Sequence, residues 1–179
     1  MSVEAIKKLR DMTSVGVNDC RKALADSGGD FDKALKILKE RGGQMVEKRS
    51  GRQTSQGVIE AYLHFGGNLG AMVEVNCETD FVARTEVFKK FAKDVAMQVA
   101  AANPIYVKKE DIPEAVLEAA ADKNAWIKEH CLLEQVYVKD GKISVAEYLR
   151  DIISQTGENV VIRRFSRFAL GETNEAAKS

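Results

Sequence analysis

Residues 74–84 read EVNCETDFVAR, and within this stretch a strand pattern gives way to a helix pattern. Residues 69–76 alternate apolar and polar side chains, as a half-buried strand does. Thr79 or Asp80 is suited to cap a helix, because a side-chain oxygen can accept from the free N–H groups of the first turn. The stretch therefore predicts a β-to-α junction, with an acid and an aromatic, Asp80 and Phe81, in the first helical turn.

Two further runs fit the same sheet. Residues 58–65, VIEAYLHF, alternate as a strand, and the GGN that follows predicts a hairpin turn into residues 69–76. The glycines of this turn do not indicate a phosphate loop, because such a loop leads from a strand into a helix and here a second strand follows. The run NVVIRRFSRFALGE, residues 159–172, is β-rich and suits a third strand.

Helical patterns fill the interval between the second and third strands. We expect a long helix over residues 79–102, ended by the following Asn-Pro, and a second over residues 113–129. An extended segment follows near residues 134–142, and then a helix over residues 144–157 that opens with a capping box and stops at glycine. The apolar stripe of the long helix consists of Phe88, Phe91, Val95 and Val99. Residues 58–172 thus predict an α+β core, an antiparallel sheet of about three strands with helices on one side.

The first 42 residues predict a separate small unit. Apolar residues recur at helical spacing in three short segments, and Gly42-Gly43 is expected to end the third. Because such a small core offsets little of the chain entropy lost on folding, the unit would be marginally stable alone. We expect it to serve as a docking module. Residues 43–57 are polar and aperiodic and predict a linker, and residues 173–179 predict a frayed tail.

Composition and motifs argue against a catalytic or metal site. The chain of 179 residues has three cysteines without a CxxC pair and two histidines far apart. It has no nucleophile elbow, P-loop or HExxH motif. We therefore expect no catalytic residue, no metal and no cofactor. Apolar runs fall far short of the ~20 residues of a membrane span, and the N-terminus lacks a signal-peptide core, so a cytoplasmic protein without membrane contact is expected.

Charge favours a protein partner over nucleic acid. The 27 basic and 27 acidic residues cancel, with a net +4 over residues 1–57 and −4 over the remainder. That bias is weak for a nucleic-acid binder, and no direct nucleic-acid contact is expected. One alternative is an RNA-binding strand face made of Arg163, Arg164, Phe165, Arg167 and Phe168. Simple alternation divides these residues between two faces and so leaves no single basic-aromatic surface.

Phe81 permits two interpretations. It precedes Phe88 by seven residues, so extending the helical period places it on the buried stripe. Alternatively, the first turn projects beyond the sheet, and Phe81 is an exposed anchor with Asp80 aimed at a partner. The exposure of the Phe81 side chain distinguishes the two interpretations.

Several stretches resemble bacterial elongation factor Ts, in its short form with a single core subdomain. Residues 9–24, LRDMTSVGVNDCRKAL, resemble the N-terminal signature of that family, and residues 74–84 resemble its second signature closely. Residues 133–140 and 164–172 resemble segments near the family's C-terminal end. The likeness covers about the whole chain in order. One departure is Ser14, where the family's Thr-Gly-Ala-Gly turn has glycine.

The resemblance implies a guanine nucleotide exchange factor for the translational GTPase elongation factor Tu. It implies that the N-terminal module is similar to a ubiquitin-associated domain and docks on the GTPase through Arg10, Val17 and Asn18. It further implies that Thr79, Asp80, Phe81 and Val82 reach the nucleotide site, where Phe81 acts as a wedge and disturbs Mg²⁺ beside the phosphates. Short members are expected to act as homodimers. The alternative, from another class, is a helical adaptor for protein interactions without exchange activity.

Overall fold

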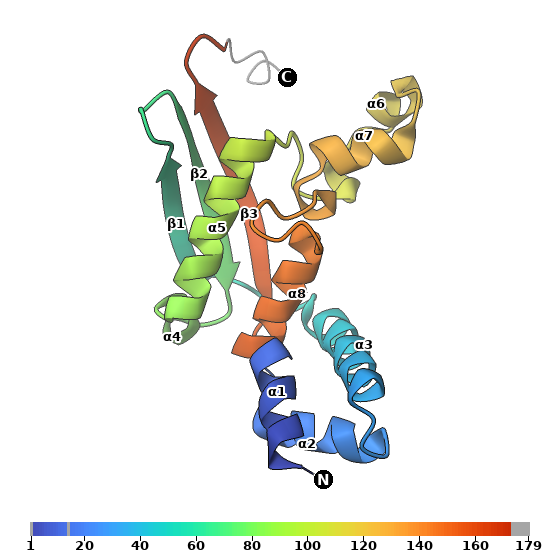
Figure 1. Cartoon of the computed structure of the whole chain (residues 1–179). Coiled ribbons are helices and arrows are strands. Elements are labelled where there is room, and N and C mark those ends of the chain that lie inside the picture. Colours follow the sequence, from blue (N-terminus) through green and yellow to red (C-terminus); the bar gives the residue numbers. More distant parts are fainter. Residues whose placement is uncertain (1, 14, 173–179) are drawn as a thin grey trace.

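The computed structural model of the chain describes residues 2–13 and 15–172 (Figure 1). The expected tail, residues 173–179, and the departure at Ser14 lie outside the described residues. In this part of the chain a three-helix unit stands at one end of an α+β body, which confirms the predicted fold class.

The N-terminal unit contains α1 (Val3–Thr13), α2 (Val17–Asp26) and α3 (Phe31–Arg49). Asp30 caps α3, and its carboxylate accepts from the backbone N–H of Lys33. The three helices enclose a small core of their own. Its buried residues are Leu9, Cys20, Ala23, Leu24, Ala34 and Leu38.

The predicted end of the third helix is wrong. The helix continues through Gly42 and Gly43 to Arg49, so the first part of the expected linker is helical. Each glycine costs a helix about 1 kcal/mol relative to alanine, which sequence reasoning treats as a stop. Here α3 packs against α8 (Val145–Thr156), and Val46 joins the main core, so tertiary packing offsets that cost.

The sheet has the predicted three antiparallel strands, β1 (Gln56–Leu63), β2 (Leu69–Cys77) and β3 (Val160–Ala169), in the order β1-β2-β3. In the register, Val58 pairs with Val75 of β2, and Val75 pairs with Ile162 of β3. The register between β2 and β3 shifts at Glu74/Val75, which marks a bulge.

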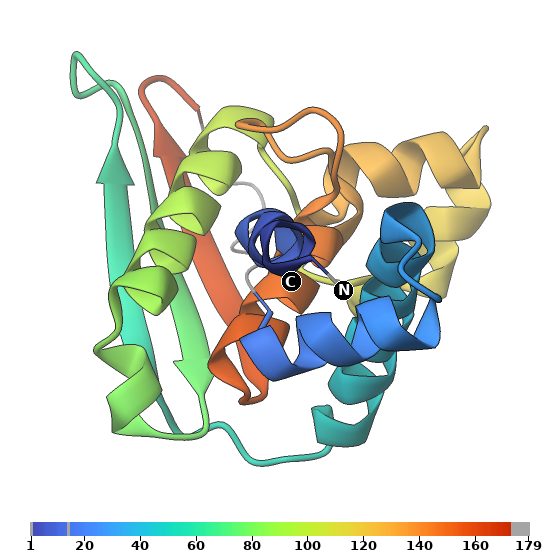
Figure 2. The ribbon, with the colours of Figure 1, turned by 60° about the horizontal axis from the view of Figure 1, so that its bottom comes forward.

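The helices lie on one side of this sheet, as predicted (Figure 2). After β2 come α4 (Asp80–Ala83) and α5 (Glu86–Ala102), and the predicted stripe of α5 is buried. The short elements that follow are η1 (Lys109–Asp111), α6 (Glu114–Ala119), α7 (Lys123–His130) and η2 (Leu132–Glu134). The last helix, α8, opens with the predicted capping box of Ser144 and Glu147 and ends at Gly157, whose φ is 74°.

Two of the predicted helices are each divided in two. Thr85 accepts from the backbone N–H of Phe88, so α5 starts afresh after α4. Asp122 accepts from Asn124 and Ala125 and starts α7 separately from α6. In both cases an internal capping residue favours a new helix start over continuation of the first helix.

A buried carboxylate joins three elements of the core. Asp94 of α5 is 2% exposed and accepts from the hydroxyls of Tyr137 at 2.9 Å and Tyr148 at 3.0 Å. Lys139 donates to the same carboxylate at 2.5 Å. Burial alone would raise the pKa of Asp94, but these three hydrogen bonds together lower it. Asp94 thus ties α5 to α8 and to the loop before it.

Asp94→Asn is expected to lower the free energy of unfolding at neutral pH by about 1–3 kcal/mol, because it removes the charge that three donors share. The native pKa is lowered, so this stabilisation is present above the unfolded pKa of about 3.9 and is lost as pH falls through the native value. Denaturant unfolding across pH 3 to 7 measures the difference in the free energy of unfolding between wild type and variant. This difference should become smaller below about pH 4. Asp11→Asn, at an exposed site on α1, is the control. A difference that stays constant with pH would contradict this role of Asp94.

Candidate functional site

The predicted junction forms a short helical tip at the end of β2. Thr79 caps α4, and its hydroxyl accepts from the backbone N–H of Val82 at 3.3 Å. Cys77 precedes it in the core, and its Sγ donates to the Thr79 carbonyl at 3.1 Å. Burial, followed by the charge of Glu158, raises the pKa of the Cys77 thiol to about 11, so this residue stays a neutral thiol.

Phe81 points away from the core at this tip and is 79% exposed. The interpretation of Phe81 as a member of the buried stripe is therefore wrong. The ring is exposed, as the alternative requires, and its role as an anchor for a partner stays a prediction. The buried interpretation fails because a helical period cannot be extended across the break between α4 and α5, where Thr85 provides a new start. Phe88, on the other side of that break, is fully buried.

The neighbours of Phe81 anchor the tip. Ala83 is buried, and Val82 packs against the main core. Asp80 forms an ion pair with Arg84 at 2.9 Å, and its side chain remains 46% exposed. The tip thus presents one apolar ring and one carboxylate outward while its other side is fixed to the sheet body.

Glu158 is a contact of the tip that sequence reasoning missed. It follows the glycine that ends α8, and its carboxylate accepts from the Thr79 hydroxyl at 2.6 Å and the Thr79 backbone N–H at 3.0 Å. The two residues are 79 positions apart, so no local pattern connects them. Only the antiparallel pairing of β2 with β3, which brings Cys77 opposite Val160, indicates their proximity.

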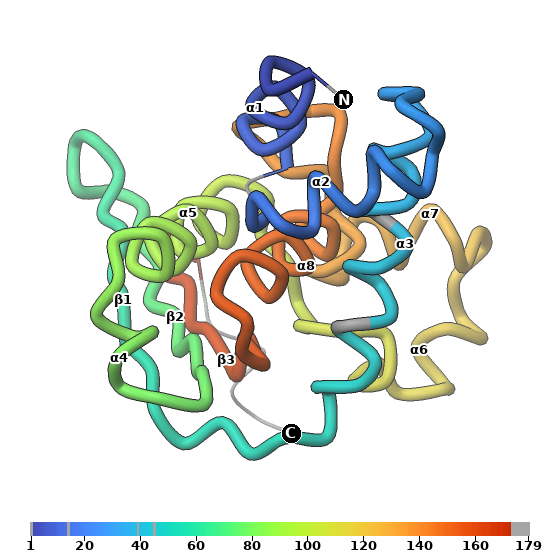
Figure 3. Tube along the Cα trace, turned by 90° about the horizontal axis from the view of Figure 1, so that it is seen from below, coloured from blue at the N-terminus to red at the C-terminus, as the bar shows by residue number. Residues whose placement is uncertain are grey.

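The predicted docking residues of the module lie on a separate element from the tip. Arg10 is in the last turn of α1, and Val17 and Asn18 open α2, so all three flank the connection between these helices. All three are exposed. Thr79, Asp80, Phe81 and Val82 lie together in one turn. Figures 1 and 3 show α8 between this turn, in α4, and helix α3 of the module, so the tip and the module are separate surfaces.

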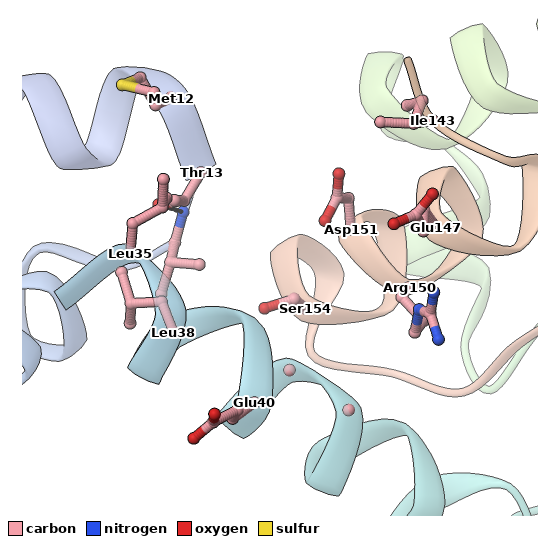
Figure 4. Close-up of a pocket in the computed structure, with 13 residues that line it drawn as sticks. Met12, Thr13, Leu35, Leu38, Glu40, Ile143, Glu147, Arg150, Asp151 and Ser154 are labelled. Atoms are coloured by element: carbon pink, nitrogen blue, oxygen red, sulfur yellow. Dashed lines mark hydrogen bonds between the residues drawn. The ribbon is translucent and has the colours of Figure 1, made fainter. Parts of the chain in front are cut away.

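A cavity of about 340 Å³ lies between the module and α8 (Figure 4). The module contributes mainly apolar side chains, such as Leu35 and Leu38, and α8 contributes polar ones, such as Arg150 and Ser154. The described lining has neither cysteine nor histidine and includes none of the predicted site residues. The candidate site therefore lies outside this cavity, at the tip.

The other site types find no support in the described residues. No group of three potential metal-binding side chains occurs there. No helix in residues 2–13 and 15–172 has the length and apolarity needed to cross a membrane. The five residues of the basic-aromatic strand face do not share one surface, but the simple alternation used for them is wrong at Arg163, which lies on the open face with Arg164 and Phe168. The bulge turns Arg163 toward Asn76, whereas Arg167 binds the Ala100 carbonyl on the helix side.

Phe81→Ala is expected to leave the free energy of unfolding within about 0.5 kcal/mol of wild type, because the ring has few contacts to lose. Phe88→Ala, the matched control seven positions on, is expected to cost about 3–5 kcal/mol, because it leaves a cavity in the core. Urea denaturation of both variants measures the difference. A loss of several kcal/mol at Phe81 would mean that the ring is buried in solution.

Comparisons with known proteins agree with the resemblance. The family model described as elongation factor TS matches residues 5–125, more than half of the chain. Elongation factor Ts of Caldanaerobacter subterraneus subsp. tengcongensis is 44% identical over 96% of this chain and 98% of its own length. Those of Thermotoga neapolitana and Thermotoga petrophila are 45% and 42% identical, over 96% and 98% of this chain and 98% of each relative. The chain belongs to the elongation factor Ts family of translation elongation factors.

Proposed function

We propose that the chain is a guanine nucleotide exchange factor for elongation factor Tu and acts in the cytoplasm during translation elongation. The observation that carries the proposal is the exposed Phe81 ring on a tip whose backbone is fixed to the sheet body. An exposed aromatic ring on a capped turn contributes little to the stability of the fold. When a partner covers the ring, its burial contributes favourably to the free energy of binding. That arrangement suits a wedge.

The chemistry required of such a wedge is small. In a GTPase, Mg²⁺ bridges the phosphates and neutralises their charge, so displacing its ligands weakens nucleotide binding. No bond is made or broken in GDP release, so this chain needs no general base, no cofactor and no metal of its own. Phe81 displaces partner side chains, Asp80 presents its charge to the partner, and Thr79 and Val82 hold the turn that carries them.

The coupling between factor and nucleotide is reciprocal. If the factor weakens GDP binding by about 10⁴, GDP weakens binding of the factor by the same ratio, about 5.5 kcal/mol. A second, separate contact is then useful, because it keeps the factor near the GTPase while the tip acts. In this proposal Arg10, Val17 and Asn18 of the module supply that contact.

Phe81→Ala is expected to reduce the acceleration of GDP release by about 30-fold or more, the factor for a contact worth about 2 kcal/mol. Release of fluorescent GDP from elongation factor Tu, with and without the chain, measures it. Phe65→Ala is the matched control, because Phe65 is 97% exposed but lies in the hairpin turn at the other end of the sheet. If wild type binds other proteins and leaves GDP release unchanged, the chain is an adaptor and the proposal fails.

We also propose that the chain forms a homodimer through the open face of the sheet. The face away from the helices carries apolar side chains that are each at least half exposed, namely Ile59, Leu63, Met72 and Phe168. At the polar end of this face Glu74 pairs with Arg164 at 2.7 Å. A second copy fits this face because a two-fold axis pairs a patch with itself and so covers the apolar side chains of both copies.

Sedimentation equilibrium tests the dimer. Wild type is expected at twice the chain mass, and Met72→Glu at the mass of one chain, because the new carboxylate would be buried without a partner. Ile105→Glu is the control, since Ile105 is exposed to a similar extent but lies outside the sheet. A wild-type monomer, or a Met72→Glu variant that remains dimeric, would contradict the proposed interface.

A further inference from the structure

Three segments far apart in sequence meet beneath the tip. They are residues 50–52 after α3, residues 78–79 at the β2–α4 junction, and residues 158–159 between α8 and β3. The first segment follows the module, and the second leads into the tip. The third follows α8, the helix that lies between α3 of the module and the tip (Figure 1).

Two carboxylates cross between the tip and the start of β3. Besides its two bonds to Thr79, Glu158 accepts from the backbone N–H of Glu78 at 3.1 Å. In return, Glu78 accepts from the backbone N–H of Asn159 at 2.6 Å. That N–H, together with the charge of Arg52, lowers the pKa of the Glu78 carboxyl. Hydrogen bonds to an ionised acceptor are stronger than those between neutral groups. We call this pair of carboxylates, Glu78 and Glu158, with the N–H groups that they bind, the clasp.

The same clasp holds the chain that leaves the module. The side-chain amide of Asn159 donates to the carbonyls of Arg52 at 2.9 Å and Ser50 at 3.5 Å. Arg52 lies 3.4 Å from the Glu78 carboxylate. Each of the three segments therefore has a direct contact with at least one other through a charged or amide side chain.

The tip depends on such support from outside itself. α4 has four residues, too few for a helix to be stable by its own hydrogen bonds. The Phe81 ring is mostly exposed, so the direction in which it points is set by the backbone of residues 79–82. Among the described contacts of Thr79, those from Glu158 fix both its N–H and its hydroxyl, which in turn caps α4.

We propose that Glu158 is a positioning residue for nucleotide exchange, which holds the first turn of α4 so that Phe81 keeps its direction while it displaces groups of the GTPase. This role rests on the proposed exchange function. In this role Glu158 acts through Thr79, which it binds at both the N–H and the hydroxyl. If the turn moved when Phe81 met the GTPase, the ring would not displace the groups of the partner. A misplacement of about 1 Å can cost on the order of 10² in rate.

The experiment compares full-length wild type, Glu158→Ala, Glu158→Gln and Glu118→Ala, the last being an exposed glutamate on α6. Amide hydrogen exchange of residues 78–84 in the free protein reports the tip without reference to activity. GDP release from elongation factor Tu, titrated to saturation, separates the maximum rate from the half-saturating concentration. Thermal melting shows that each variant is folded.

Glu158→Ala is expected to speed amide exchange at Glu78 and Thr79 about tenfold or more, as expected for the loss of a charged acceptor. Its maximum GDP-release rate should fall about tenfold or more, with the half-saturating concentration changed less than about threefold, because docking by the module is untouched. Glu158→Gln keeps an acceptor oxygen and should lie between Glu158→Ala and wild type. Glu118→Ala should match wild type in every readout.

The positioning role alone is overturned if wild type is active and Glu158→Ala keeps its maximum rate. It is also overturned if the tip amides of Glu158→Ala exchange as in wild type, or if only the half-saturating concentration changes. A wild-type chain that does not accelerate GDP release overturns the exchange function, and with it the positioning role. The hydrogen-exchange result then still shows whether the clasp holds the tip.

Discussion

The burial of one face of α5 between the sheet and α8 is the packing interaction on which the rest of the structure depends. Phe88 and Phe91 are fully buried there, and Asp94 on the same helix receives hydrogen bonds from α8 and the preceding loop. With α5 fixed in this way, the few residues between β2 and α5 have little freedom. They form the α4 tip, and its exposed ring follows from the packing of the helix behind it.

This arrangement places buried residues that stabilise the fold within a few positions of exposed residues that do not. The residues on the core side of the junction, Cys77 and Ala83, are buried, whereas Asp80 and Phe81 contribute little to the fold and remain available to a partner. Because the Phe81 ring has few contacts within the chain, another protein can cover it without loosening the sheet. In the proposed mechanism Thr79, which caps α4 and is bound by Glu158, holds the turn while the ring is pressed against the partner.

The fold class, the strands, the α8 capping box and the buried stripe of α5 could be predicted from the sequence, because each rests on a local period or cap. The path of α3 through two glycines could not, since its packing on α8 overrides an intrinsic cost of about 1 kcal/mol per glycine. Phe81 was ambiguous because Thr85 interrupts the period. Glu158 was missed since it meets Thr79 only through strand pairing, and Arg163 was misplaced by the bulge.

The central proposal is that the Phe81 tip promotes release of GDP by disturbing the magnesium that holds the phosphates in elongation factor Tu. The most direct test measures the factor-dependent acceleration of GDP release twice, in millimolar Mg²⁺ and in excess EDTA. We expect a large acceleration with Mg²⁺ and a clearly smaller one without it, because the contribution of the metal to GDP binding is then already removed. An equal acceleration under both conditions, or none with Mg²⁺ present, would contradict it.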